Sequence, residues 1–170
     1  MITRHALVDT QLGEVTLVAS GGAITGLYFP HHWYKPAQDT FGQRVSLDGD
    51  SCLSDAAQQL VSYLNGTRTT FDLPLEAAGD TFQQQVWALL QDVPFGETTT
   101  YGALAQKLGD RSLAQSVGKA VGRNPLCVFI PCHRVLGSDG SLTGYAGGLR
   151  RKRFLLALEE PALVKAGRLF

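Results

Sequence analysis

A hinge predicted at residues 77–80 divides the chain into a part that mixes strands with one helix and a part that is mainly helical, and this division limits the folds open to it. Before this point, two short β-rich runs separated by a glycine pair predict a β-hairpin, at Val15–Ser20 and Ala23–Phe29. After it, apolar residues recur at helical spacing. A chain of 170 residues can form one sizeable core or two small domains that share an interface. We therefore expect an α/β unit at 1–78 and a mainly helical unit at 79–170.

The first unit also contains a predicted helix. Apolar residues at helical spacing from Leu53 to Leu64 predict an amphipathic helix with Ser51 or Ser54 as its cap and Asn65-Gly66 as its stop. The segment 31–43 has no clean period and predicts a connecting loop. Residues Phe71–Glu76 alternate like a short strand.

The second unit contains a pattern typical of a helix-turn-helix. A first helix is expected to be capped by Thr81 and ended by Pro94. Two short helices follow, at 98–109 and 113–125, joined by a three-residue turn and with the small Ala105 at their crossing. Two ordinary packed helices would give the same pattern, so the helix-turn-helix needs support from charge.

Charge supplies that support, because the basic residues gather in the second part of the chain. Overall, 15 Lys and Arg balance 15 Asp and Glu. Up to Phe95 there are four basic and ten acidic residues, whereas 96–153 has nine basic and three acidic residues. Only the second part is therefore predicted to face a polyanion, although a solvated basic helix face is the simpler alternative.

The segment 126–137 carries the side chains best suited to chemistry. Val128–Ile130 form an apolar run that Pro131 ends, so we expect Cys132 at the end of a buried strand. On an extended strand Cys132 and His133 would point to opposite faces. A turn there would let the imidazole approach the sulfur, directly or through a water molecule. Such a base lowers the pKa of a thiol and produces the reactive thiolate.

The chain has three cysteines, an odd number without paired metal spacing, so neither a disulfide scaffold nor a zinc ribbon is predicted. Cys52 and Cys127 are expected to be small buried residues. Arg134 adds positive charge beside Cys132. The sequence shows neither a long apolar run nor a secretory signal, so we expect a cytoplasmic protein with no membrane contact.

Three motifs resemble the O6-alkylguanine-DNA alkyltransferases, which move an alkyl group irreversibly from guanine to a cysteine: IPCHRV at 130–135, LTGYAGG at 142–148 and RKRFLLALE at 151–159. The resemblance is dense from about Thr81 to Glu159 and weaker before it. It implies a ribonuclease-H-like α/β domain followed by a mainly helical domain with a winged helix-turn-helix-like motif. The implied activity is single-turnover DNA repair with flipping of the damaged base.

The resemblance implies roles for individual residues. Cys132 would be the alkyl acceptor and His133 the base that takes its proton through a bridging water. Glu159 would orient the histidine, as in a catalytic triad. Asn124 would brace the turn before the acceptor. Tyr101 would crowd a DNA phosphate and donate a hydrogen bond to the leaving guanine.

Two further sets of residues follow from the resemblance. The substrate pocket would use a tyrosine beside the alkylated oxygen, a backbone carbonyl for the exocyclic amine, and glycines that let backbone line a flat slot: Tyr145, Val135, Gly144, Gly147 and Gly148. The DNA-binding set would be Thr100, Ser112, Gln115, Lys119, Arg123 and Arg134.

Gln115 departs from the family pattern, because relatives usually carry at this position an arginine that fills the gap left by the extruded guanine. Glutamine can bond the orphaned cytosine but lacks the charged, stacking fork of arginine. Either Gln115 fills the gap less well, or Arg111 or Lys119 contributes from nearby. We predict weaker duplex affinity with the reaction retained.

Three other functions compete with alkyl transfer. A lesion-binding recruiter of the same family would lack the cysteine, so Cys132 argues against it. A helix-turn-helix regulator would leave the PCHR motif and Glu159 without a purpose. A cysteine hydrolase would need an oxyanion site and a histidine remote in sequence.

The expected partner is double-stranded DNA containing O6-alkylguanine, and repair of O4-alkylthymine is left open. We expect a monomer in solution, with the packing of several copies along one DNA also left open. No cofactor is expected. The His31-His32 pair suggests a metal, but the cysteine and histidine ligands of zinc-holding relatives are not visible, so no metal is expected.

Overall fold

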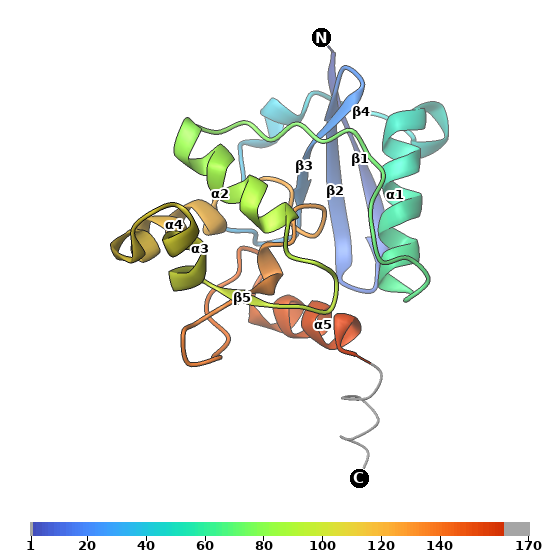
Figure 1. The fold of residues 1–170 in the computed structure, drawn as a ribbon. Coiled ribbons are helices and arrows are strands. Elements are labelled where there is room, and N and C mark those ends of the chain that lie inside the picture. The colour runs from blue at the N-terminus through green and yellow to red at the C-terminus, as the bar shows by residue number, and fades with distance from the viewer. Residues whose placement is uncertain (1, 162–170) are drawn as a thin grey trace.

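The computed structural model describes residues 2–161 and begins with a four-stranded sheet (Figure 1). The order is β3-β2-β1-β4, with β1 and β2 antiparallel, β2 and β3 antiparallel, and β4 parallel to β1. Their bounds are Thr3–Thr10 (β1), Gly13–Ser20 (β2), Ala23–Tyr28 (β3) and Gln43–Arg44 (β4). The predicted hairpin is β2 and β3, and β1 is a strand that the sequence analysis did not predict.

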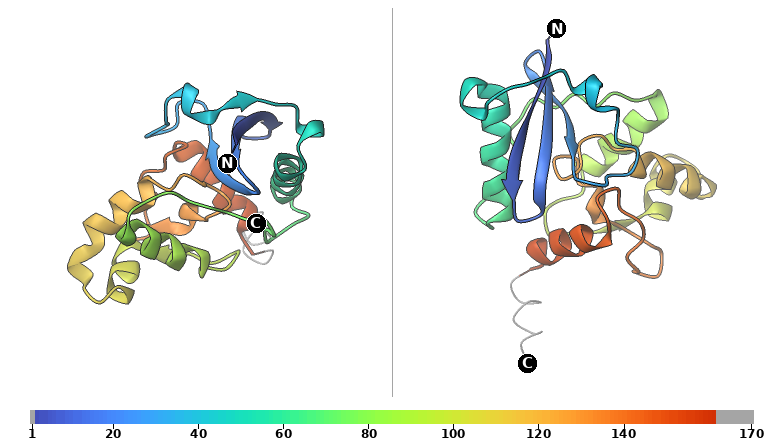
Figure 2. Two further views of the ribbon diagram at one scale, coloured as in Figure 1. Left: turned by 90° about the horizontal axis from the view of Figure 1, so that it is seen from above. Right: turned by 180° about the vertical axis from the view of Figure 1, so that it is seen from behind.

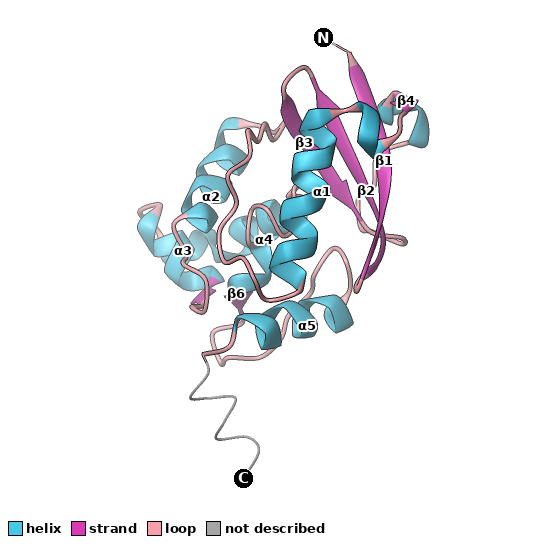
Figure 3. Ribbon diagram, turned by 90° about the vertical axis from the view of Figure 1, so that its right-hand side faces the viewer, coloured by secondary structure: helices cyan, strands magenta, loops and turns pink. Residues whose placement is uncertain are grey.

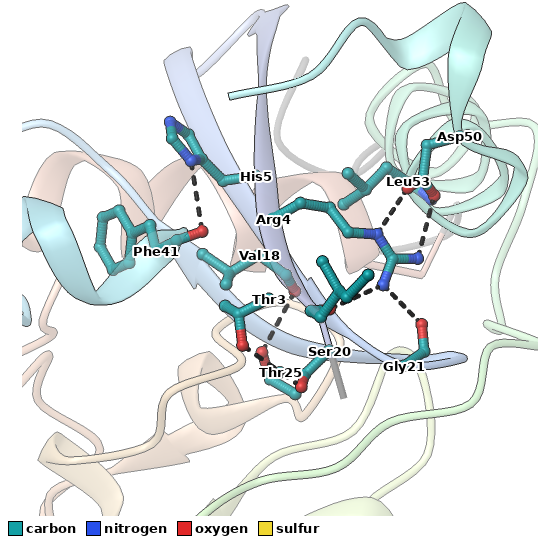
Figure 4. Close-up of polar contacts among 11 residues, drawn as sticks. Thr3, Arg4, His5, Val18, Ser20, Gly21, Thr25, Phe41, Asp50 and Leu53 are labelled. Carbon is teal, nitrogen blue, oxygen red and sulfur yellow. Dashed lines mark hydrogen bonds and ion pairs between the residues drawn. The ribbon is translucent and has the colours of Figure 1, made fainter. Parts of the chain in front are cut away.

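Helix α1 (Ser51–Leu64) packs on this sheet (Figure 3). The residue that caps it is Asp50, whose carboxylate accepts a hydrogen bond from the amide of Leu53. Neither Ser51 nor Ser54, the two expected caps, has this role. The same carboxylate is paired with Arg4 of β1, so one aspartate both starts the helix and fastens it to the sheet (Figure 4). Asn65 and Gly66 end the helix as predicted, with Gly66 at a φ of 81°.

The second part of the chain is mainly helical. Helix α2 (Thr81–Gln91) begins with a capping box between Asp80 and Gln83, so the expected cap at Thr81 is off by one residue. Helix α3 (Tyr101–Lys107), a short 3₁₀ turn at Arg111–Leu113 and helix α4 (Ala114–Gly122) form the helix-turn-helix, with both helices shorter than predicted. The indole of Trp87 donates to the carbonyl of Ala120 at 2.8 Å, which ties α2 to α4.

A two-stranded parallel sheet connects the helix-turn-helix to the region around Cys132. It pairs β5 (Thr99–Thr100), which leads directly into α3, with β6 (Val135–Leu136). Helix α5 (Leu149–Glu159) then packs against the 3₁₀ helix Cys132–Arg134. Figure 2 shows α3 and α4 on the side of the molecule away from α1.

The two parts share one hydrophobic core. Backbone pairs join β3 to Leu75 and to Leu126, so segments from both parts extend the edge of the first sheet. Within residues 71–76, as described by the structure, only Leu75 makes such a pair, and the expected strand is not formed. In the described part of the chain, no helix is long and apolar enough to cross a membrane.

Candidate active site

Cys132 lies just after a tight turn, and the prediction of a buried strand that ends at the cysteine is wrong. Val128 has a φ of 76°, and Cys127 pairs with Ile130 across the turn. The chain then enters a 3₁₀ helix at Cys132–Arg134. The apolar run is buried as expected, but the left-handed residue folds it back on itself.

Asn124 holds this turn. Its amide nitrogen donates to the carbonyl of Ile130 and its amide oxygen accepts from the backbone of Leu126, both at 2.9 Å. The side chain is buried, so these bonds are protected from competing water. Asn124 therefore fixes the backbone that leads to Cys132, which is the bracing that the resemblance implied.

His133 and Glu159 are hydrogen-bonded to each other. Nε2 of His133 lies 2.8 Å from Oε2 of Glu159, and both side chains are buried. Because a carboxylate only accepts, Nε2 carries the hydrogen and Nδ1 is the basic nitrogen of the neutral ring. Within residues 2–161, Nδ1 has no hydrogen-bond partner and no bond joins His133 directly to Cys132. Burial lowers the pKa of His133, so the neutral ring predominates near neutral pH.

Glu159 is held as an anion by several donors. Arg134 donates from Nε to Oε1 and from Nη2 to Oε2, both at 2.8 Å, and the hydroxyl of Tyr63 also donates to Oε2. Burial alone would raise the pKa of Glu159, but the bonds from His133 and Arg134 outweigh it and lower the pKa to about 2. The carboxylate therefore keeps His133 in one orientation and one tautomer.

The expectation that Arg134 contacts DNA is wrong, because Arg134 is an interior residue. Its guanidinium is bonded to Glu159 and to the backbone carbonyl of Val93. Only 7% of the residue is exposed. Arg134 therefore acts by holding the carboxylate of Glu159.

Cys132 is buried among groups that favour its thiolate. The pKa of Cys132 is lowered, first by its contact with Cys127, whose sulfur lies 3.7 Å away, and also by Asn124 and by the charge of Lys152. Burial opposes these effects. Lys152 is itself buried, with Nζ 2.7 Å from the carbonyl of Val135 and 3.1 Å from that of Thr143. Cys132 as a whole is only 3% exposed.

Two tyrosines lie near the sulfur. The hydroxyl of Tyr101, in the first turn of α3, is 2.7 Å from the hydroxyl of Thr143. Burial raises the pKa of Tyr101, so the phenol stays protonated and can donate a hydrogen bond. Tyr145 is buried, and its hydroxyl makes no conventional hydrogen bond among the described residues but interacts with the thiol of Cys127.

Close packing explains why glycine stands at positions of the expected pocket, and the resemblance did not imply this reason. A Cβ on Gly144 would lie 2.6 Å from the ring of Trp33, and one on Gly147 would lie 2.5 Å from that of Phe29. Gly148 precedes α5 with a φ of 94°. Glycine is therefore required at Gly144 and Gly147 at least partly because rings from the N-terminal part of the chain pack closely against their backbone.

The carbonyl of Val135, expected to accept from a guanine amine, accepts from Lys152 in this structure. A carbonyl oxygen has two lone pairs, so the bond from Lys152 does not by itself exclude a second donor. The expectation for Val135 thus stays a prediction.

The helix-turn-helix presents polar side chains to solvent. Ser112, Gln115 and Lys119 are exposed, as is Arg111, one of the two residues expected to assist Gln115. Thr100 caps α3, with its hydroxyl accepting from Ala103.

Arg123 is also exposed, and its guanidinium stacks on the ring of Tyr34 at 4.0 Å. Direct contact of these residues with DNA stays a prediction.

Three site residues were missed by the sequence analysis. Tyr63 of α1 contacts both Glu159 and His133, the latter with 3.4 Å between its hydroxyl and Nε2. Nothing in the local sequence of α1 signals this role. Lys152 was visible in principle, because it precedes Glu159 by seven residues and so lies on the same face of a helix. Cys127 was interpreted only as a small buried residue.

No group of three or more His, Cys, Asp or Glu side chains within residues 2–161 is arranged to hold a metal ion. His32 is buried and accepts from the amide of Phe29, whereas His31 is exposed. The histidine pair therefore diverges and does not act as one ligand unit.

Comparison with known proteins extends over both parts of the chain. Residues 3–77 match the family described as 6-O-methylguanine DNA methyltransferase, ribonuclease-like domain. Residues 81–161 match the family described as 6-O-methylguanine DNA methyltransferase, DNA binding domain.

Curated relatives and solved structures agree with these matches. A methylated-DNA–protein-cysteine methyltransferase of Mycobacterium tuberculosis is 40% identical over 156 residues, or 92% of each chain. A constitutive protein of the same name from Bacillus subtilis is 38% identical over 160 residues, covering 91% of this chain and 94% of that one. The crystal structure of M. tuberculosis OGT in complex with DNA superposes with a TM-score of 0.83 at 38% identity, covering 95% of this chain and 97% of that one. With both of its parts matched, the chain belongs to the 6-O-methylguanine DNA methyltransferase family.

Proposed function

We propose that this protein repairs DNA by moving the alkyl group of O6-alkylguanine onto Sγ of Cys132 in one irreversible turnover. The observation that carries the proposal is the buried pair of His133 and Glu159 beside a cysteine of lowered pKa. The names of the relatives and the structure of M. tuberculosis OGT with DNA support the same reaction and the same partner.

The proposed reaction begins with proton removal. Nδ1 of His133 is the free basic nitrogen, and a water molecule between it and Sγ would carry the proton of Cys132 to the ring. Glu159 stabilises the imidazolium that results. Lys152 and Cys127 stabilise the thiolate. A sulfur anion is thus produced inside the protein, where water competes little for it.

Displacement follows at the alkyl carbon. The thiolate attacks in line with the C–O bond, so the S–C bond forms as the C–O bond breaks and the electron pair stays on guanine. Tyr101, kept protonated by burial, is the proton donor for the departing base. Because the thioether product is chemically stable, each molecule is expected to react once.

The damaged base would reach the sulfur by rotating out of the duplex. Cys132 is buried, so a base inside a stacked helix cannot reach it. We assign the holding of duplex DNA to the exposed side chains of the helix-turn-helix, Ser112, Gln115 and Lys119, and their exposure supports this assignment. We include in this proposal the cytoplasmic location and the monomeric state predicted from the sequence.

A transfer assay tests the proposal. The protein is incubated with a duplex that carries O6-methylguanine labelled in the methyl group, and the digested protein is analysed by mass spectrometry. Label on the peptide that contains Cys132, at no more than one methyl per protein, is expected. Tight lesion binding without label would instead indicate a recruiter, release of a small labelled product would indicate a hydrolase, and equal binding to undamaged duplex without label would indicate a regulator.

A further inference from the structure

Cys127 is a second buried thiol that the proposed reaction does not use as a nucleophile. Its sulfur lies 3.7 Å from Sγ of Cys132, 3.8 Å from the carbonyl oxygen of Asn124 and 3.9 Å from Nε2 of His32. All these distances are within reach of hydrogen bonds to sulfur. Cys127 itself is fully buried. The second thiol is therefore in contact with the nucleophile on one side and with a histidine of the N-terminal part on the other.

His32 has only one tautomer that fits its surroundings. The amide of Phe29 donates to Nδ1 at 3.2 Å, so Nδ1 is unprotonated and the hydrogen is on Nε2. Burial, with Lys35 and Arg151 nearby, lowers the pKa of His32 to about 4, so the ring is neutral at physiological pH. Stacking on Phe29 and edge contact with Tyr28 fix its orientation. Nε2–H is thus aimed at the sulfur of Cys127 as a donor.

The position of the Cys127 hydrogen depends on the state of Cys132. While Cys132 is a thiol, it can donate to Cys127, and Cys127 can donate to the carbonyl of Asn124. Once Cys132 has lost its proton, its sulfur becomes the stronger acceptor. The two acceptors lie at nearly equal distances from Cys127, so rotation of one S–H bond transfers the hydrogen bond to the thiolate.

We propose that His32 and Cys127 are positioning residues for the nucleophile: Nε2–H of His32 donates to Cys127, and the S–H of Cys127 donates to the thiolate of Cys132. The inference rests on the proposed function, because it explains how that reaction obtains its thiolate. It also gives the N-terminal part of the chain a direct role at the sulfur. The chain of donors runs from the backbone of Phe29, through the imidazole and the second thiol, to the atom that receives the alkyl group.

The surrounding charges decide which of the two thiols ionises. Lys152 and Asn124 favour the anion at Cys132, and the pKa of Cys127 is raised by its bond to Cys132 and by burial. Cys127 therefore keeps its proton as a donor. The other titratable groups that face this thiol pair come from separate elements and are neutral at physiological pH: Tyr101 of α3, Tyr145 before α5, Tyr28 of β3, and His133 beside Cys132.

The test measures the ionisation of Cys132 without DNA. The whole protein and its Cys127→Ala, Cys127→Ser and Cys52→Ala variants are treated with iodoacetamide between pH 5 and pH 10, and mass spectrometry follows the Cys132 peptide. Loss of one hydrogen bond to a thiolate should raise the midpoint of the profile for Cys127→Ala by about one pH unit, which is about a tenfold slower reaction below the midpoint. Cys127→Ser, which keeps a donor, should restore most of this loss. Cys52→Ala, at a partly exposed thiol of α1, should match the wild type.

His32→Phe tests the first donor of the chain. It should raise the midpoint in the same direction by less than Cys127→Ala, because Cys127 remains, and thermal melting would show that the variant is folded. An unchanged profile for Cys127→Ala would overturn the inference, as would equal shifts for alanine and serine, since packing alone would then explain them. Failure of the methyl-transfer assay with these shifts intact would refute the proposed function and leave the donor chain standing.

Discussion

Replacement of Glu159 by glutamine should affect stability and chemistry through different contacts. Glu159 is nearly fully buried and accepts from Arg134, His133 and Tyr63. Glutamine keeps the shape but removes the charge, which leaves the guanidinium of Arg134 buried without its anion. Breaking a buried pair in this way costs about 3–5 kcal/mol of unfolding free energy.

The lowered pKa of Glu159 gives a second estimate of how much this carboxylate stabilises the fold, and it predicts how that stability depends on pH. Lowering the pKa from 4.5 to about 2 corresponds to about 3 kcal/mol of stability. For a carboxyl group whose folded pKa is depressed, this stability is fully present above the unfolded pKa, near 4.3. It is lost as the pH falls towards about 2. Wild-type protein should therefore lose stability between about pH 5 and pH 2, and the Glu159→Gln variant should show a flatter curve there.

The Arg134→Met, Glu159→Gln double variant separates the two effects. Removing the unpaired guanidinium should recover at least about 1 kcal/mol relative to Glu159→Gln alone. Methyl transfer should stay about 100-fold or more below wild type in both variants, because glutamine does not hold Nε2–H of His133 in the productive tautomer. Urea unfolding, followed by tryptophan fluorescence at several pH values, measures the first effect, and single-turnover transfer measures the second. A double variant no more stable than the single one, or a Glu159→Gln variant that loses less than about 1 kcal/mol, would refute this account of the carboxylate.

Three further predictions concern the nucleophile and the DNA surface. Cys132→Ser should abolish transfer, because a hydroxyl is far less nucleophilic than a thiolate. The variant should keep lesion binding in a gel-shift assay, because serine is similar in size to cysteine. Transfer at the wild-type rate would exclude Cys132 as the acceptor. Gln115→Arg should tighten duplex binding about threefold or more at fixed salt, because the guanidinium supplies charge and a stacking surface. Unchanged affinity would show that this position does not limit binding. Affinity should also fall steeply as salt rises from about 50 to 200 mM, because phosphate contacts release counterions, and a flat response would argue that the basic surface does not meet DNA.

Local sequence pattern predicted those elements whose stability is decided locally. The apolar spacing of 53–64 and the Asn65-Gly66 stop gave α1, and the glycine pair between two β-rich runs gave the hairpin β2 and β3. Strand β1 was missed because His5 and Arg4 interrupt its apolar pattern. In the structure, His5 bonds the backbone near Phe41 and Arg4 bonds Asp50, partners that a local pattern does not contain.

The site was predicted where a resemblance identified residues and missed where contacts span the fold. Cys132, His133, Asn124 and Glu159 come together through one turn and one helix. Arg134 was misplaced because its anion lies 25 residues later in α5, and nothing near Arg134 in sequence indicates burial. The left-handed Val128 was missed because a β-branched residue disfavours that conformation, and its surroundings impose it.

Tyr63 places a hydroxyl from α1 against the carboxylate of Glu159, which is hydrogen-bonded to His133. The acidic part of the chain supplies none of the residues expected to meet DNA, yet through this hydroxyl it contacts the carboxylate that holds His133. Exchange of N-terminal segments between relatives should thus work best where the incoming helix brings a phenol to that place, and grafts with phenylalanine there should repair more slowly.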